Sequence, residues 1–423
     1  MSVASVAWAI CASVSLLASS GSTAGTLTSG GTYVVQPDPA VARAVVELWF
    51  RVPAAGYDNA TPGLSSVAAT AVAASNQPHG ISLSEFARNA GGSLSINTYP
   101  DMLSVVVSAP AGRTREIVRA LTAAYFTPSI SAAGFHDALR DEAVAAQEQM
   151  FEPHAALRDM LFAQLFSQGP AHYGTMPDSA EALAQLSPER VKNFAVRAFR
   201  SQNAILILAG NVQSSDVTSA AAGPPGDAMD APHDSIAAPH PADLVKSGSV
   251  RGVGLGWLGP PITEARAAAA LDLVANVLFD ARNGTVYRAL SKLEPAVSVN
   301  GQFITLHSAG VLAVTISGAR SDVAKAATLE AVSALANPLS PEAFESSRKA
   351  LLYRVASETS TARTMADNVG WYVLQGDAAG APGDPSGQYA RDVASLDPAY
   401  VAQIVRTYVT RPVIVELNAE VPR

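Results

Sequence analysis

The chain is poor in the residues that hold metals and cross-links. Its 423 residues include one cysteine, Cys11, and seven histidines. A single cysteine excludes a disulfide within the chain and a zinc site built from thiolates. No two histidines stand four residues apart, so the sequence has no two-histidine motif on one helix; they are His79, His136, His154, His172, His233, His240 and His307. We interpret the first six of these histidines as turn, linker, surface or helix-cap residues.

Charged residues are also scarce, at 15% of the chain, and the formal net charge is −8. Because no lysine- or arginine-rich run offsets that charge, the composition argues against a nucleic-acid partner. Hydrophobic residues make up 48% of the chain. That content argues against general disorder. At this length, two domains are the natural expectation.

The N-terminal segment lacks charge altogether, since the first charged residue is Asp38. Residues 3–17 are apolar and residues 18–24 are small, which is typical of a signal peptide over residues 1–24. Export to the periplasm or the exterior follows from that interpretation. The alternative is a disordered extension or a wrong start, and then a cytoplasmic protein, because the n-region has no Lys or Arg. No later stretch indicates a membrane span in the mature chain.

Proline and glycine are concentrated between residues 220 and 246, where they predict a linker. The linker separates an N-terminal lobe, residues 25–219, from a C-terminal lobe, residues 247–423. Near its end each lobe has a capping residue, a proline in the first helical turn and then a strand: Ser187-Pro188 precedes residues 205–208, and Asp397-Pro398 precedes residues 413–415. The chain therefore contains an internal repeat.

A second set of elements repeats in the same order. Strands at residues 93–97 and 103–107 precede a helix at 113–125, and strands at 296–303 and 311–317 precede a helix at 323–335. Strands followed by massed helices indicate an α+β class. We expect two homologous lobes, each an antiparallel sheet with helices on one face.

Several segments, taken in order, resemble the insulinase/pitrilysin zinc peptidases, the family that includes the mitochondrial processing peptidases. The similar segments are residues 30–39, 45–51 with the glycine turn at 55–58, Gly91-Gly92 followed by Asp101, Pro153 between two helices, 209–212, 253–260 and 284–290. The resemblance covers nearly all of the chain after its N-terminal segment. It implies the metallopeptidase fold shared by LuxS and the processing peptidases.

The resemblance also implies a catalytic motif, His-x-x-Glu-His, which this sequence lacks. Two histidines at i and i+4 share a helix face and can bind one zinc, and the glutamate activates the metal-bound water. In the corresponding helix, which follows Gly63, the three positions are Ser66, Ala69 and Thr70. Spacing from Phe135 and Pro153 places the third ligand at or near Ala145. We therefore expect no zinc, no other cofactor and no catalytic residue.

Two carboxylates flank the expected third-ligand position by about one helical turn, Glu142 and Glu148. Either could retain a role in the site. Hydroxyls are poor Zn²⁺ ligands and alanine supplies none. Two other features have ordinary packing interpretations, namely Trp371-Tyr372 on a helix and Tyr287-Arg288. The latter pair has the residue types that active relatives use in the second lobe to stabilise substrate, but its match to those positions is not established.

The leading hypothesis is a non-catalytic homologue that serves as a partner subunit of an active zinc-bearing relative and helps to capture unfolded peptide. Strand edges can bind peptide by β-addition without a metal. Two alternatives stay open. One is an active metallopeptidase with displaced ligands, and the other is a structural assembly protein like the core subunits of respiratory complexes.

Overall fold

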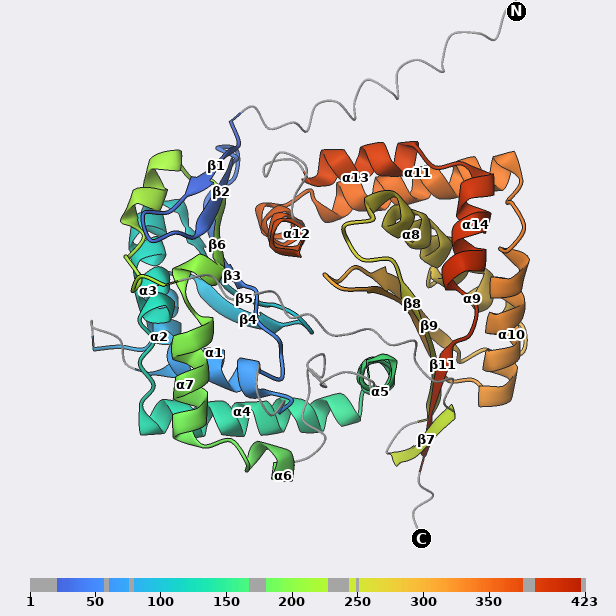
Figure 1. The fold of residues 1–423 in the computed structure, drawn as a ribbon, viewed down its shortest axis with the longest axis horizontal. Helices are drawn as coiled ribbons and strands as arrows, with labels where there is room; N and C mark the ends of the chain where they lie inside the picture. Colours follow the sequence, from blue (N-terminus) through green and yellow to red (C-terminus); the bar gives the residue numbers. More distant parts are fainter. Residues whose placement is uncertain are drawn as a thin grey trace, which may run out of the picture.

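The computed structural model describes two sheets, each with its own helices, side by side (Figure 1). The described residues are 21–56, 61–75, 80–166, 180–226, 243–248, 251–375 and 385–419. The signal segment up to residue 20, Tyr57, Asp58, His79, His172, His233 and His240 lie outside these ranges. The first lobe contains β1–β6 and α1–α7, and the second contains β7–β11 and α8–α14.

The sheet of the first lobe has the order β1-β2-β6-β3-β5-β4. All its neighbours pair antiparallel except β2 and β6, which pair parallel. Parallel pairing is possible there because the chain returns to β6 through several helices. The strands are β1 (Thr23–Thr26), β2 (Thr32–Pro37), β3 (Arg43–Phe50), β4 (Ser93–Thr98), β5 (Leu103–Pro110) and β6 (Ala204–Gly210).

The helices of the first lobe cover one face of this sheet. Alternate β3 residues Val46, Leu48 and Phe50 point into that core, as the two-residue period of a strand requires. The helices are α1 (Leu64–Ala74), α2 (Leu83–Asn89), α3 (Thr114–Phe126), α4 (Ala132–Met150), α5 (Pro153–Leu165), α6 (Ala180–Leu183) and α7 (Pro188–Ala198), with short 3₁₀ helices η2 (Ala111–Arg113), η3 (Ser201–Asn203) and η4 (Ser214–Ser219).

The second lobe repeats the arrangement in the order β7-β11-β8-β10-β9, again with one parallel pair, β7 and β11. Its strands are β7 (Asp243–Gly248), β8 (Gly252–Gly259), β9 (Ser298–Ile304), β10 (Gly310–Ser317) and β11 (Val413–Ala419). Its helices are α8 (Ala265–Phe279), α9 (Thr285–Leu290), α10 (Ser321–Ala334), α11 (Pro341–Glu358), α12 (Ala362–Gln375), α13 (Pro385–Ala394) and α14 (Pro398–Tyr408).

Each lobe has one helix that packs on the sheet of the other lobe. Helix α5 leaves the first lobe and packs on the second sheet, where Leu157, Leu161 and Leu165 join Val413 and Val415 in one apolar cluster. Helix α12 does the reverse: Ala366, Val369 and Leu374 pack on strands β2, β3, β5 and β6 of the first sheet. Both helices lie between the lobes in Figure 1. As a result, helices cover both faces of both sheets.

The local signals that begin these helices are the ones read from the sequence. The Ser187 side chain accepts a hydrogen bond from the backbone nitrogen of Arg190, and Asp397 does the same for Tyr400. Each cap satisfies one of the backbone donors left free at a helix start. Pro188 and Pro398 follow in the first turn, where no amide hydrogen is needed.

The α+β class and the two homologous lobes are confirmed, and the structure adds detail to them. One pair of strands in each sheet is parallel, and a helix from the other lobe covers the second face of each sheet. Residues 243–246 were expected in the linker but belong to β7, the counterpart of β2. Strand β1 starts at Thr23, inside the expected signal segment.

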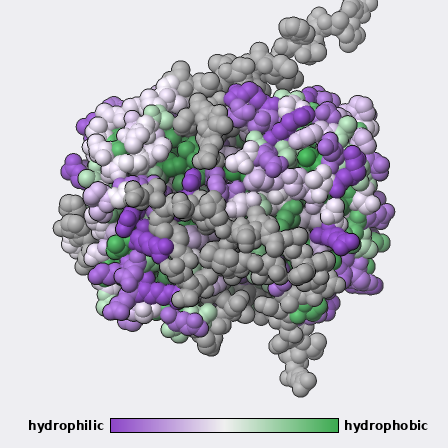
Figure 2. All heavy atoms as spheres, in the orientation of Figure 1, coloured by the Kyte–Doolittle hydropathy of each residue, from purple (hydrophilic) through white to green (hydrophobic). Residues whose placement is uncertain are grey.

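Most of the coloured side chains on the face drawn in Figure 2 are hydrophilic or intermediate, with small hydrophobic patches between them. The largest buried side chains belong instead to the cores and to the junction between the lobes, among them Trp49, Trp257 and Tyr125. None of the helices that the structure describes is both long and apolar enough to cross a membrane.

Candidate functional site

The three motif positions lie on α1, directly after a left-handed turn. Gly63 precedes the helix with φ of 86°, a conformation that glycine adopts without steric cost. Ser66 and Thr70 are half-buried one turn apart, whereas Ala69 is fully buried. The carbonyl oxygen of Ala69 accepts a 2.9 Å hydrogen bond from the hydroxyl of Tyr125. At the position of the general base, the chain therefore has a packing residue.

The carboxylate that faces this helix comes from Glu142 on α4. The Ser66 hydroxyl donates a hydrogen bond of 2.5 Å to Glu142 Oε2. Ala145 and Glu148, farther along α4, are exposed. The residue of α4 that lies beside the first-ligand position is thus Glu142 and not Ala145, one helical turn from the position that the spacing had indicated.

Glu142 is buried, with 7% of its surface exposed. Burial raises the pKa of its carboxyl group, and the hydrogen bond from Ser66 opposes that increase. A carboxyl group removed from water favours its neutral form. The Ser66–Glu142 pair is a hydrogen bond between two packed helices, and it provides a single strong metal ligand.

This donor set does not fit zinc. Zinc sites in proteins use imidazole, thiolate or carboxylate ligands, three in a catalytic site. Ser66, Ala69 and Thr70 offer two hydroxyls and a methyl, and Glu142 adds one carboxylate. Within the described ranges, no group of three or more His, Cys, Asp or Glu side chains could hold a metal ion.

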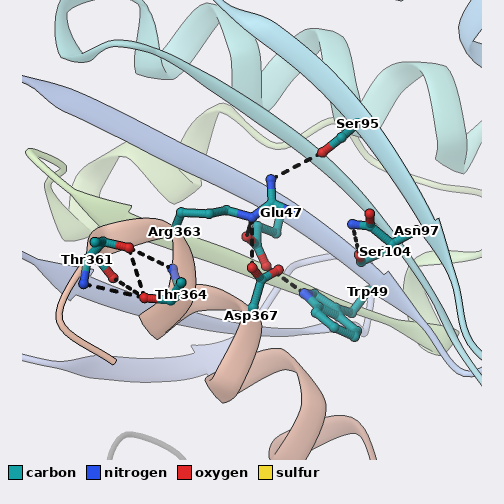
Figure 3. A network of polar contacts seen from close by, with 9 residues as sticks. All are labelled: Glu47, Trp49, Ser95, Asn97, Ser104, Thr361, Arg363, Thr364 and Asp367. Atoms are coloured by element: carbon teal, nitrogen blue, oxygen red, sulfur yellow. Dashed lines mark hydrogen bonds and ion pairs between the residues drawn. The ribbon is translucent and has the colours of Figure 1, made fainter. Parts of the chain in front are cut away.

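A second polar cluster lies at the junction of the lobes, where α12 packs on β3 (Figure 3). Glu47 is in the middle of β3 and fully buried. Its Oε2 accepts a 2.7 Å hydrogen bond from the Trp49 indole nitrogen. Arg363 Nε lies 3.5 Å from Glu47 Oε1 and 2.8 Å from Asp367 Oδ2. Arg363 also donates to Ser95 Oγ at 3.2 Å, so it connects both lobes.

The electrostatics of this cluster disfavour a charged Glu47. Burial raises the pKa of Glu47 to about 8, and the nearby Asp367 carboxylate adds to the increase, while Trp49 and Arg363 oppose it. Glu47 Oε1 and Asp367 Oδ1 are both buried and have no hydrogen-bond partner among the residues that the structure describes. A carboxyl pair in such surroundings favours one proton over none.

The C-terminal end of α12 is held by residues of both lobes. Arg51, just after β3, donates to the carbonyl oxygen of Leu374. His307 Nδ1 lies 2.8 Å from the Gln375 carbonyl oxygen, and the His307 backbone nitrogen donates to Asp101 Oδ2 at 3.1 Å. Burial raises the pKa of Asp101 to about 6, against the effect of the hydrogen bond from His307. These contacts satisfy carbonyl groups that a helix end leaves unpaired.

The other exchanged helix, α5, has a histidine at its contact with the second sheet. His154 Nδ1 lies 2.9 Å from Thr315 Oγ1 on β10, and its Nε2 lies 3.0 Å from Ser298 Oγ on β9. The interpretation of His154 as a surface or cap residue is therefore wrong, because it bridges the lobes. His136 is exposed, in agreement with that interpretation.

Trp371 and Tyr287 both pack against apolar clusters of the described structure. Trp371 lies on α12, donates a 2.9 Å hydrogen bond to Thr305 Oγ1 and packs at the lobe junction. Tyr287 packs partly buried against the second core, and Arg288 is exposed.

Sequence reasoning missed the role of Glu47. The available signal was a single acidic residue within the apolar run of residues 44–50, since a buried charge needs a partner.

Comparisons with known proteins agree with the fold. Residues 185–351 match the family model described as the peptidase M16 inactive domain; M16 is the insulinase-type peptidase family. No curated protein shows significant similarity. A protease from Helicobacter pylori superimposes with a TM-score of 0.81 at 14% identity, over 94% of this chain and 99% of that one.

Two further solved structures have the same architecture. A peptidase M16 inactive domain from Pseudomonas fluorescens has a TM-score of 0.76 at 15% identity, covering 95% of this chain and 99% of that one. A chain of complex III2 from Candida albicans has a TM-score of 0.78 at 11% identity, covering 94% and 96%. The whole chain thus has the fold of M16-like peptidases, and residues 185–351 match the peptidase M16 inactive domain, in agreement with the resemblance seen in the sequence.

Proposed function

We propose that the protein is a non-catalytic subunit that pairs with an active, zinc-bearing homologue and helps to bind its peptide substrate. The observation that carries this proposal is the contrast between fold and site. Both lobes keep the M16-like architecture, yet the ligand positions on α1 are Ser66, Ala69 and Thr70. A fold kept without its metal ligands favours binding over hydrolysis.

Peptide binding is supported by the edges of the two sheets. Strands β4 and β9 are the last strands of their sheets. An edge strand has backbone donors and acceptors that an extended peptide can pair with. Such pairing needs no metal, so the missing ligands do not weaken this part of the proposal.

The test is co-expression with a homologue that has an intact His-x-x-Glu-His motif. We expect the two chains to elute together from size-exclusion chromatography, with zinc bound only to the homologue, and we expect chelator-sensitive peptide cleavage by the pair to exceed that of the homologue alone. The matched control is a homologue whose motif glutamate is replaced by glutamine, which should bind this chain without cleavage. Stoichiometric zinc and cleavage by this chain alone would contradict the proposal.

A second candidate is an assembly role without peptide binding, and the similarity to a chain of complex III2 favours it. Purification from native membranes distinguishes the two. A chain always found in a large membrane complex, whose isolated form has no measurable affinity for unfolded peptides, would fit the assembly role and not the partner subunit.

Export is part of the same proposal. The apolar segment at residues 3–17 and the small residues after it support a cleaved signal peptide. Cleavage before Thr23 would leave β1 and its pairing with β2 intact. N-terminal sequencing of the mature protein is the measurement, and an intact Met1 in a cytoplasmic fraction would count against export.

A further inference from the structure

The contact between α12 and the first sheet contains two buried carboxyl oxygens that lack a donor. Glu47 Oε1 and Asp367 Oδ1 have no hydrogen-bond partner among the described residues, while the second oxygen of each carboxyl group accepts from Trp49 or Arg363. Both residues contact the same guanidinium, that of Arg363, and Figure 3 shows them facing each other across the junction. One proton between these two oxygens would satisfy both.

We propose that a proton shared by Glu47 and Asp367 fastens α12 to the first lobe, so that the two lobes dock more tightly at acidic than at alkaline pH. With that proton bound, the cluster of two carboxyl groups and one guanidinium is neutral. Loss of the proton to solvent leaves two carboxylates and one guanidinium, and hence a net negative charge at the interface. Separation of α12 from β3 returns those carboxylates to water.

The surroundings of Glu47 make this charge costly. Its cross-strand neighbours are Val106 on β5 and Ile207 on β6, which cannot stabilise it. The titratable and charged groups that face it are Asp367 and Arg363 on α12 and Tyr99 after β4. Burial raises the pKa of Tyr99 to about 12, so the phenol stays neutral.

The access of the cluster to solvent makes it reversible. Glu47 is fully buried, but the side chains of Arg363 and Asp367 are 34% and 32% exposed. A proton can therefore leave or enter from the α12 side without unfolding of either core. The surface by which α12 docks is separate from the cores of the two lobes. Its residues Ala366, Val369 and Leu374 belong to an apolar cluster of their own at the lobe junction.

The expected size of the effect follows from proton linkage. Docked α12 binds one proton more than undocked α12 at pH values between the ordinary carboxyl pKa of 4.5 and about 8. A single linked proton changes the docking constant by up to about tenfold per pH unit in that window. Docking therefore weakens as the pH rises through the window and becomes independent of pH above it.

Hydrogen exchange of the full chain tests the proposal, with each protection factor referred to the chemical exchange rate at the same pH. Between pH 6 and pH 9, we expect the protection of residues 363–375 to fall by about tenfold or more in the wild type. In Glu47→Gln, which keeps the Trp49 hydrogen bond but cannot ionise, the fall should be less than about threefold. Helix α10, away from the junction, should respond equally in both proteins.

The matched control is Glu142→Gln, which removes a buried carboxyl group from the first lobe but not from the junction. In this variant, the hydrogen-exchange protection of α12 should fall between pH 6 and pH 9 as much as it does in the wild type. If Glu47→Gln does not fold, Asp367→Asn removes the other half of the pair and should abolish the response in the same way. An unchanged response in the Glu47 or Asp367 variant, a wild-type α12 whose protection does not depend on pH, or equal losses in α10 and α12 would each overturn the proposal. The outcome does not depend on the proposed partner function.

Discussion

At the scale of single residues, the most informative pair is Ser66 and Glu142. The serine stands where the resemblance places a histidine, and the glutamate accepts its hydrogen bond from the neighbouring helix. Thr70 is one turn away on the same helix. A carboxylate of α4 therefore lies beside the first-ligand position of α1, although the side chains at the three motif positions of α1 are not zinc ligands.

This geometry predicts that two substitutions create a zinc site. In Ser66→His/Thr70→His, the two imidazoles and the Glu142 carboxylate would supply three ligands. We expect one zinc per chain by elemental analysis and by Co²⁺ absorption, with no zinc in the wild type. Both positions are half-buried, so neither substitution is made at a fully buried site.

The control for this design adds Glu142→Gln to the double variant. It should weaken zinc binding by about tenfold or more, since an amide is a poorer ligand than a carboxylate. Adding Ala145→Glu instead should have little effect, because Ala145 is exposed one turn away. If added Ala145→Glu strengthened zinc binding more than Glu142→Gln weakened it, the assignment of Glu142 as the third ligand would be contradicted.

The sequence was sufficient to locate α1 and its three substituted positions, because a helix motif is defined by local spacing. It was not sufficient to choose between Ala145 and Glu142, which are separated by about one helical turn. That choice depends on the packing of α4 on α1, and packing between helices is a tertiary property. The contact of Ser66 with Glu142 is visible only in three dimensions.

At the scale of elements, glycines allow the close packing of α5 and α12 on the sheet of the opposite lobe. Helix α5 has leucines at positions 157, 161 and 165, four residues apart, and the facing residues of β8 are Gly252, Gly254 and Gly256. A Cβ atom at Gly254 would lie 3.0 Å from Leu161 Cδ1. The alternating glycines of β8 thus make room for a helix of the other lobe, a contact that no local pattern predicts.

Helix α12 uses a glycine in the same way, at Gly370. A Cβ atom there would lie 2.2 Å from the Trp49 indole nitrogen. We expect Gly370→Ala to lower the free energy of unfolding by about 1–3 kcal/mol, because overpacking at this rigid ring outweighs the gain of up to about 1 kcal/mol in helix propensity. Urea denaturation measures the change.

Gly112→Ala is the matched control, since a Cβ atom at Gly112 would meet nothing within 4 Å. Its effect on the unfolding free energy should be close to zero. A Gly370→Ala protein as stable as the wild type would show that α12 does not seat on Trp49.

The order of strands and helices could be predicted because each element has a local period and local caps, as at Ser187 and Asp397. The exchange of α5 and α12 could not. Their apolar faces indicate burial but do not say against which sheet. The same limit applied to His154, whose partners Thr315 and Ser298 are more than 140 residues away in the chain.

At the scale of the whole molecule, the helix exchange should hold the lobes together without a covalent link. We expect a chain with a protease site inserted between residues 226 and 243, once cleaved, to elute as one particle in size-exclusion chromatography at pH 6. The reason is that each half covers a sheet face of the other through α5 or α12. Separation of the halves under these conditions would contradict that expectation.

The contact between α5 and the second sheet should become less stable in acid. Burial lowers the pKa of His154, although the nearby Glu152 opposes this. Its unfolded form therefore binds a proton at a pH where the folded form does not, and the stability that its neutral ring contributes is lost as the pH falls below about 6.5. The direction is opposite to that expected for the Glu47 cluster.

We therefore expect His154→Gln to be less stable than the wild type at pH 8, where the neutral ring makes its hydrogen bonds with Thr315 and Ser298. The difference in unfolding free energy should shrink as the pH is lowered from 7 to 5. Urea denaturation at several pH values measures it, and His136→Gln, at an exposed site, is the control. A difference that stays constant over this range would argue against titration of His154.

The aromatic residues at the lobe junction have a practical consequence. Trp49 of the first lobe stacks on Tyr99, with 5.6 Å between the ring centroids. Tyr99 in turn meets Trp371 of the second lobe edge-on, with 5.0 Å between the ring centroids. Among the described tryptophans, only Trp257 lies elsewhere, in the core of the second lobe. Intrinsic indole emission, with its wavelength and quenching, should therefore report the opening of the two lobes in an unlabelled protein.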